Sequence, residues 1–171
     1  SKLNNITSLT FCLCNKLNYQ DLPLLANLTS LTHLQIRSAD IVSLDFLEHT
    51  PGLQRLEIIR CKKLNDVFAL AYCQKLTSLT IRSTDVANIN AIAQLKDLED
   101  LTFYQCAKLN NISALRGLHK LSTLHLDSCK VNDLGPLAGL TELTTLSVYG
   151  WGDIVDLSPL QKLRKLNILH L

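Results

Sequence analysis

The sequence predicts an α/β solenoid, a fold in which one short strand and one tight return are stacked many times. In the stretch 76–97 the apolar residues first alternate, as in a strand, and then recur every three residues, as in a 3₁₀ turn. They are Leu76, Leu79, Ile81, Val86, Ile89, Ile92 and Leu95. The leucine that opens this pattern recurs at alternating intervals of 22 and 23 residues, at Leu31, Leu53, Leu76, Leu98, Leu121, Leu143 and Leu166. A unit this small cannot bury its own apolar edge, so it needs a copy on each side.

A family resemblance follows from this spacing. Repeats in the low twenties with the pattern L-x-x-L-x-[L/I] are typical of leucine-rich repeats. The chain resembles the 22-residue type found in internalin-like and SDS22-like proteins, most clearly in the stretches 133–146 (DLGPLAGLTELTTL) and 156–166 (DLSPLQKLRKL). The resemblance implies a curved leucine-rich repeat solenoid, with a parallel β-sheet on the concave face and 3₁₀ or short helical returns on the convex face. It is nearly silent about the ligand.

The domain organisation is simple. We expect one solenoid domain, residues 1–171, of about seven coils, with the first copy of the repeat starting at Ile6. Three tandem units of 45 residues, 31–75, 76–120 and 121–165, indicate duplication of a two-coil unit. Both ends lie inside a repeat and carry no polar cap, so the sequence reads as a fragment of a longer chain.

The position just after each strand departs from the common repeat, in which an asparagine bonds to the backbone of adjacent coils. This ladder position holds Cys14, Ala39, Cys61, Thr84, Cys106, Cys129 and Trp151. Cysteine and threonine are small and can offer a weak S–H or an O–H donor to the same carbonyls. The cysteine-rich ladder resembles a variant of some eukaryotic and protist proteins, including trypanosomatid ones. Trp151 is too large for such a position, and between two glycines it is expected to point outward.

Cysteine usage bears on the compartment. We expect Cys73 in the core and Cys12 facing out of its strand. Buried, unpaired cysteines favour a reducing compartment, cytoplasmic or nuclear. Three glycosylation triplets, at Asn5, Asn27 and Asn111, leave a cell-surface or secreted location open.

Candidate binding residues are those that point outward from the strands, because they are not needed to build the core. The N-terminal half places basic side chains there: Arg37, Arg55, Arg60 and Arg82. The C-terminal half places an aromatic and acidic set: Asp100, Tyr104, His125, Asp127, Tyr149 and Trp151. Tyrosine, tryptophan and arginine are the residues that most often anchor protein interfaces.

Other function classes are disfavoured. Ser147, His125 and Asp127 lie on neighbouring strands, but a flat sheet face offers no pocket or oxyanion hole for catalysis. The histidines have no metal-ligand spacing, so neither a metal nor another cofactor is expected. A net charge of +2 is too small to indicate nucleic-acid binding, and no run of 18 apolar residues indicates membrane insertion.

The sequence therefore predicts a non-catalytic module that recognises another protein on its concave face, as a monomeric domain of a larger protein. One alternative, implied by the resemblance, is a cell-surface or pathogen adhesin or receptor ectodomain of internalin-like type. Another is binding of an anionic, phosphate-bearing ligand by the arginines.

Overall fold

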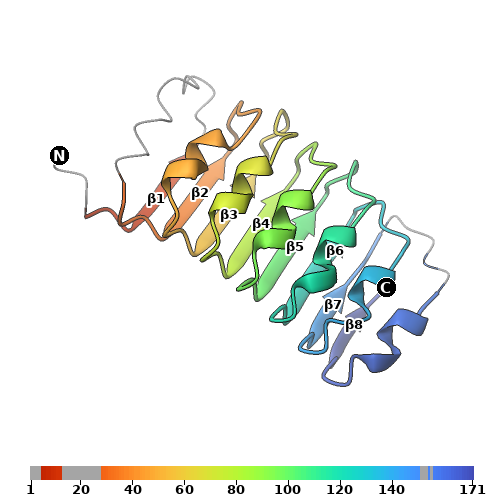
Figure 1. Ribbon diagram of the computed structural model, residues 1–171. Helices are drawn as coiled ribbons and strands as arrows, with labels where there is room; N and C mark the ends of the chain where they lie inside the picture. Colours follow the sequence, from red (N-terminus) through yellow and green to blue (C-terminus); the bar gives the residue numbers. More distant parts are fainter. Residues whose placement is uncertain (1–4, 13–27, 151–153, 155) are drawn as a thin grey trace.

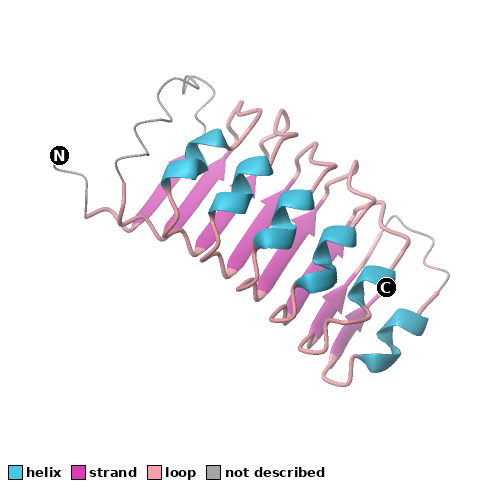
Figure 2. Ribbon diagram, in the orientation of Figure 1, coloured by secondary structure: helices cyan, strands magenta, loops and turns pink. Residues whose placement is uncertain are grey.

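Eight parallel strands in chain order form one open sheet, and short 3₁₀ helices cover one face of it (Figures 1 and 2). The structure, a computed structural model, describes residues 5–12, 28–150, 154 and 156–171. The strands are β1 (Ser8–Cys12), β2 (His33–Arg37), β3 (Arg55–Ile59), β4 (Ser78–Arg82), β5 (Asp100–Tyr104), β6 (Thr123–Asp127), β7 (Thr145–Ser147) and β8 (Ile168–His170). The helices are η2 (Asp45–His49), η3 (Phe68–Tyr72), η4 (Asn90–Gln94), η5 (Ser113–Gly117), η6 (Gly135–Leu137) and η7 (Ser158–Lys162).

The core lies between the sheet and the helices. All seven apolar residues of the 76–97 pattern are buried, which confirms the predicted division into a strand and a 3₁₀ return. Equivalent leucines stack from coil to coil, since each strand pairs in register with the next, as Leu79 does with Leu101. Burial of each such side chain contributes roughly 1.5–3 kcal/mol. The fold class predicted from the sequence, a curved leucine-rich repeat solenoid with its sheet on the concave face, is confirmed.

An Asn or Asp side chain starts five of the helical returns. Its Oδ1 accepts a hydrogen bond from the backbone N–H two residues later, as Asp66 does from Phe68 at 2.8 Å and Asn111 from Ser113 at 2.9 Å. The same bond recurs at Asn88, Asp133 and Asp156. Such local bonds favour turns over longer helices, so each return stays short.

The residue that follows each strand from β2 to β6 has a left-handed backbone. The φ angles are between 52° and 58° at Ser38, Arg60, Ser83, Gln105 and Ser128. In each case the N–H donates to a carbonyl of the next coil, for example from Ser38 to Ile59 at 2.8 Å. This geometry extends the sheet hydrogen bonding by one residue and turns the chain toward the core.

The ladder position comes next, and its side chains are buried as predicted. The thiol of Cys106 lies 3.5 Å from the carbonyl oxygen of Ile81, one coil earlier, and 3.5 Å from the Thr84 hydroxyl. Cys61 and Cys129 make the equivalent contacts to carbonyls. Cysteine thus replaces the usual ladder residue as a weak donor. Cys14 and Trp151, the ends of the predicted ladder, lie outside the described residues.

Burial also sets the chemistry of these thiols. Desolvation raises the pKa of Cys61, and it raises the pKa of Cys73, which is in the core as predicted, to about 11. The hydrogen bond to Cys106, and then burial, raise the pKa of Cys129. These three thiols are therefore protonated, unreactive core groups at neutral pH. The side chain of Cys12, by contrast, is exposed, as predicted.

Ion pairs between neighbouring coils repeat with the 45-residue unit. In the described part of the chain they are Lys63–Asp40, Lys108–Asp85, Lys120–Asp97 and Lys165–Glu142, with N–O distances of 2.6–2.7 Å. Each pair joins the two coils of one unit, and none joins two units. All are exposed, so water and salt screen the attraction and each pair contributes little to stability.

Candidate functional site

The sheet face presents three columns of outward side chains, the first, third and fifth residues of the strands. The register places Arg37 beside Ile59 and Ile59 beside Arg82, and it places Tyr104 beside Asp127. These fifth residues lie together at the carboxyl ends of the strands. Arg55 and Asp100 are first residues of their strands, and four residues of strand correspond to roughly 13 Å. Of the predicted binding residues on the strands, Arg55 and Asp100 therefore lie at one margin, Arg37, Arg82, Tyr104 and Asp127 lie at the other, and His125 lies in the middle column.

The C-terminal half of the face carries exposed aromatic rings. Tyr149 is 66% exposed, and Tyr104 is 36% exposed. Between their coils lies Asp127, the last residue of β6. An exposed tyrosine can be buried by a partner at little conformational cost, since it has only two side-chain torsions to fix.

Asp127 is held by the coil that follows it. Its Oδ1 accepts hydrogen bonds from the Ser147 hydroxyl at 2.5 Å and from the Tyr149 backbone N–H at 3.1 Å. Its Oδ2 lies 3.8 Å from Nδ1 of His125. Sheet pairing between β6 and β7 extends over three residues, against five between the preceding strands. The Asp127 carboxylate therefore accepts the hydrogen bond of the Tyr149 N–H where the backbone pairing of β6 with β7 ends.

This arrangement differs from that of a catalytic serine. In such a site the hydroxyl bonds to a histidine, and the carboxylate bonds to the far side of the imidazole. Here the hydroxyl of Ser147, which is 4% exposed, donates to the carboxylate itself. The three side chains found by sequence reasoning are thus brought together, but the hydrogen bond runs from Ser147 to Asp127 and supports the sheet margin, while His125 lies only within ion-pair distance of the carboxylate.

The N-terminal half carries a basic depression, which we call the arginine hollow. It has a volume of about 440 Å³ and is lined by Cys12, Arg37, Ser38, Ile59, Arg60 and Arg82. Ile59 is partly exposed and lies between Arg37 and Arg82 in the sheet. Arg60 reaches the same place because its left-handed backbone follows directly after β3. The alternation along the strands places Ile59 in the same outward column as Arg37 and Arg82, but it was not among the predicted binding residues.

Arg55 does not line this hollow. It lines a separate depression of about 160 Å³ with His33, Gln35 and Glu57 among others. There the Gln35 amide donates to the Glu57 carboxylate at 2.6 Å. The four arginines that the sequence suggested as one patch are thus divided by their position along the strand.

One contact joins the two halves of the face. The guanidinium carbon of Arg82 lies 5.0 Å from the centroid of the Tyr104 ring, which is a cation–π distance. The two residues are register partners on β4 and β5. Trp151, the remaining predicted site residue, lies outside the described residues.

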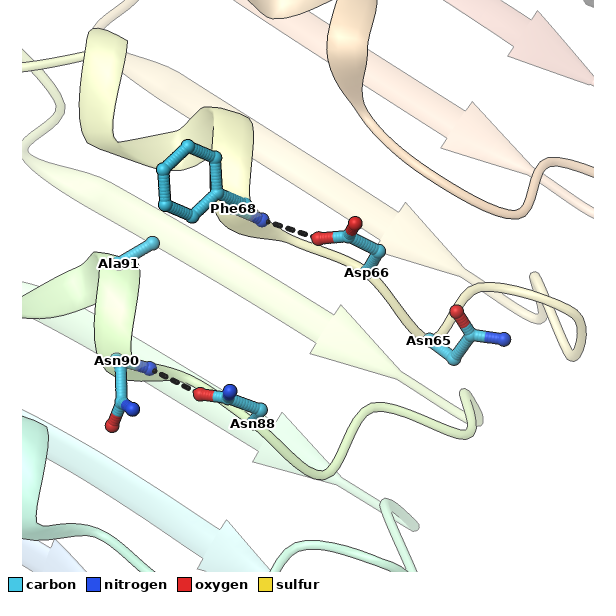
Figure 3. A pocket seen from close by; sticks show the side chains of 6 residues that line it. All are labelled: Asn65, Asp66, Phe68, Asn88, Asn90 and Ala91. Atoms are coloured by element: carbon cyan, nitrogen blue, oxygen red, sulfur yellow. Dashed lines mark hydrogen bonds between the residues drawn. The ribbon is translucent and has the colours of Figure 1, made fainter.

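A further depression lies on the helical face and was not predicted. It has a volume of about 360 Å³ between η3 and η4, and it is lined by Asn65, Asp66, Phe68, Asn88, Asn90 and Ala91 (Figure 3). Phe68 is 68% exposed, and Asp66 and Asn88 are engaged in the turn hydrogen bonds (Figure 3). Tyr72, on the same helix, is 48% exposed.

Within the described residues, no group of three histidine, cysteine, aspartate or glutamate side chains could hold a metal ion. No helix in that part of the chain is long and apolar enough to cross a membrane.

Comparison with known proteins gives structural matches only. No protein-family model matches the sequence, and no curated protein matches it. Among solved structures, internalin C2 of Listeria monocytogenes has 30% sequence identity and a TM-score of 0.78, and the match covers 88% of this chain and 66% of that chain. An internalin F of the same organism has 22% identity and a TM-score of 0.53, over 88% of this chain and 57% of that one.

A leucine-rich repeat protein of Leptospira interrogans extends the comparison. It has 18% identity and a TM-score of 0.70, and the match covers 99% of this chain and 50% of that one. The chain thus spans one half to about two thirds of the length of these proteins. The parallel sheet, the 3₁₀ returns and these matches together identify the chain as a leucine-rich repeat protein with repeats of the internalin type.

Proposed function

We propose that this chain is a non-catalytic recognition module that binds another protein across its concave sheet face. The observation that carries the proposal is the open sheet, which holds outward aromatic and arginine side chains on a rigid support. Preformed geometry lowers the entropic cost of binding, so a few anchors can supply most of the affinity. Tyr104 and Tyr149 are the proposed anchors of the C-terminal half. The commitment of the Ser147 hydroxyl to Asp127 supports a structural role for that group over a catalytic one.

The test is a pull-down from an extract of the source cells with three baits. They are the wild-type domain, a Tyr104→Ala/Tyr149→Ala variant and a matched Phe68→Ala/Tyr72→Ala variant, which removes two exposed aromatics from the helical face. All three must show equal melting temperatures. We expect a partner that the wild type and the helical-face variant retain and the sheet-face variant loses. Loss of the partner by the helical-face variant alone would move the site to that face, and the absence of any retained protein would overturn the proposal.

A second candidate is an adhesin or receptor ectodomain on a cell or pathogen surface. The identity of 30% to internalin C2 is the observation that favours it. The buried cysteines, which form no disulfide among the described residues, favour a cytoplasmic or nuclear location instead. Labelling intact source cells with a membrane-impermeant amine reagent separates the two, because a surface protein is labelled before lysis and an internal one only after it.

A further inference from the structure

We infer that the arginine hollow takes an acidic segment of the protein partner, with a carboxylate against Arg37, Arg60 and Arg82 and an aliphatic side chain on Ile59. This inference rests on the proposed function and names the chemistry of the partner at one margin of the sheet face. It differs from the anionic-ligand alternative because it assigns an apolar contact as well as a charge.

The charges of the hollow are uncompensated within the described chain. Among the described residues, none of its three arginines forms an ion pair, whereas four lysines elsewhere each pair with an acid of a neighbouring coil. Three acids each lie three residues from an arginine of the hollow, and two of them, Asp40 and Asp85, are held by Lys63 and Lys108. The third, Glu57, lies in the middle column of the same strand as Ile59, where it accepts a hydrogen bond from Gln35 and lines the other depression. A carboxylate from outside would therefore meet guanidinium groups without a competing internal partner.

Two of the arginines are oriented before binding, Arg82 at its guanidinium and Arg60 at its backbone. The Tyr104 ring supports the Arg82 guanidinium at 5.0 Å. The backbone of Arg60 is fixed by its N–H bond to the Arg82 carbonyl at 2.9 Å. A planar guanidinium can form two parallel hydrogen bonds with one carboxylate, and a fixed guanidinium loses less entropy in doing so.

The apolar floor favours a peptide over a bare anion. Ile59 lies between Arg37 and Arg82 in the sheet register and is only partly buried. A hydrated phosphate gains nothing from contact with Ile59. An aliphatic side chain next to an aspartate or glutamate of a peptide, by contrast, would remove the exposed surface of Ile59 from water. A volume of about 440 Å³ accommodates these two neighbouring side chains.

The experiment is selection from a random heptapeptide library displayed on phage, with the wild-type domain, an Arg60→Ala/Arg82→Ala variant and an Arg116→Ala/Arg164→Ala variant as targets. The last loses the same charge outside the hollow. We expect the wild type and this control to enrich peptides with Asp or Glu beside Leu, Ile or Val. The Arg60→Ala/Arg82→Ala variant should lose the enrichment, and a synthetic enriched peptide should bind it about tenfold or more weakly. Absence of acidic enrichment on the wild type, or equal enrichment on all three targets, would overturn the inference.

Two further measurements separate the ligand classes and the two proposals. The Ile59→Ser variant should bind the synthetic peptide more weakly than the wild type does. Inorganic phosphate at matched ionic strength should displace the peptide from the wild type no better than chloride does. Competition by phosphate, or indifference to Ile59→Ser, would mean a general anion site and overturn the peptide assignment. If the natural partner is lost by Tyr104→Ala/Tyr149→Ala and kept by Arg60→Ala/Arg82→Ala, the proposed function stands and this inference fails. Melting temperatures equal to wild type confirm that each variant is folded.

Discussion

The hydroxyl of Ser147 donates a 2.5 Å hydrogen bond to Oδ1 of Asp127 across the gap between two coils. The same oxygen accepts the backbone N–H of Tyr149, so one carboxylate holds the end of β6 to the segment that follows β7. Because β6 and β7 pair over only three residues, this side chain substitutes for missing sheet hydrogen bonds.

Removal of this carboxylate should destabilise the fold. Asp127→Ala leaves the nearly buried Ser147 hydroxyl and the Tyr149 N–H without their acceptor, at a cost of roughly 1–3 kcal/mol. Asp100→Ala removes an exposed carboxylate at the other margin and should cost less than about 0.5 kcal/mol. Urea unfolding of both variants measures the difference. Equal losses would mean that Asp127 is not a structural support.

The ladder position should reject large side chains. Cys106 is fully buried between stacked coils, so Cys106→Phe should overpack the core and cost roughly 1–3 kcal/mol. Cys106→Thr is the matched control, because threonine occupies the same position at Thr84. Tyr104→Ala, on the outward face, should change stability much less. Thermal unfolding checks all three, and similar shifts for Cys106→Phe and Tyr104→Ala would contradict the assigned register.

The left-handed residue that follows each strand from β2 to β6 should tolerate glycine and reject branched residues. Ser38 has a φ of 52°, which is costly for any residue with a Cβ and most costly for a β-branched one. We expect Ser38→Val to lose roughly 1–2 kcal/mol and Ser38→Gly to be neutral or slightly stabilising. Denaturant unfolding of the pair gives the answer. A valine variant as stable as the glycine variant would show that the strain is absent.

Stability should fall at high pH because of Cys73. Below pH 9 the thiol is protonated in both the folded and the unfolded chain, since its pKa rises from 9.0 to about 11 on folding. Between these values the unfolded chain releases the proton and the folded chain keeps it, so stability is lost at about 1.4 kcal/mol per pH unit, or roughly 3 kcal/mol in all. Cys73→Ala should be less stable at pH 7 but show a flatter decline above pH 9. Parallel alkaline slopes for the two proteins would contradict this assignment.

The fold could be predicted because its cause is local and repeated. Every coil must bury the same columns, so the spacing of Leu76, Leu79 and Ile81 already determines which face of each strand is inside. The burial of the ladder position could be predicted equally well, because side chains in a row after the strands have to be small to fit between coils. The columns of outward side chains could be predicted from one rule alone, that successive side chains of a strand point to opposite faces of the sheet.

The shape of the candidate site was less accessible. Grouping the arginines as one patch overlooked that Arg55 begins β3 and Arg60 follows its last residue, so the two line different depressions. Arg60 enters the hollow through a left-handed backbone angle, which its residue type does not predict. The contact of Arg82 with Tyr104 could have been found, because the two residues are 22 positions apart in the same column.

The confinement of the ion pairs to single 45-residue units constrains how such a protein can change its length. Excision of 76–120 removes two complete pairs and leaves the pairs of the flanking units intact. Excision of the single coil 76–97 instead deletes Asp85 and Asp97, and it leaves Lys108 and Lys120 without their acids. Growth or shortening by gene duplication and recombination therefore preserves the surface charge pattern in steps of two coils. Natural variants of this chain should therefore differ in length by 45 residues.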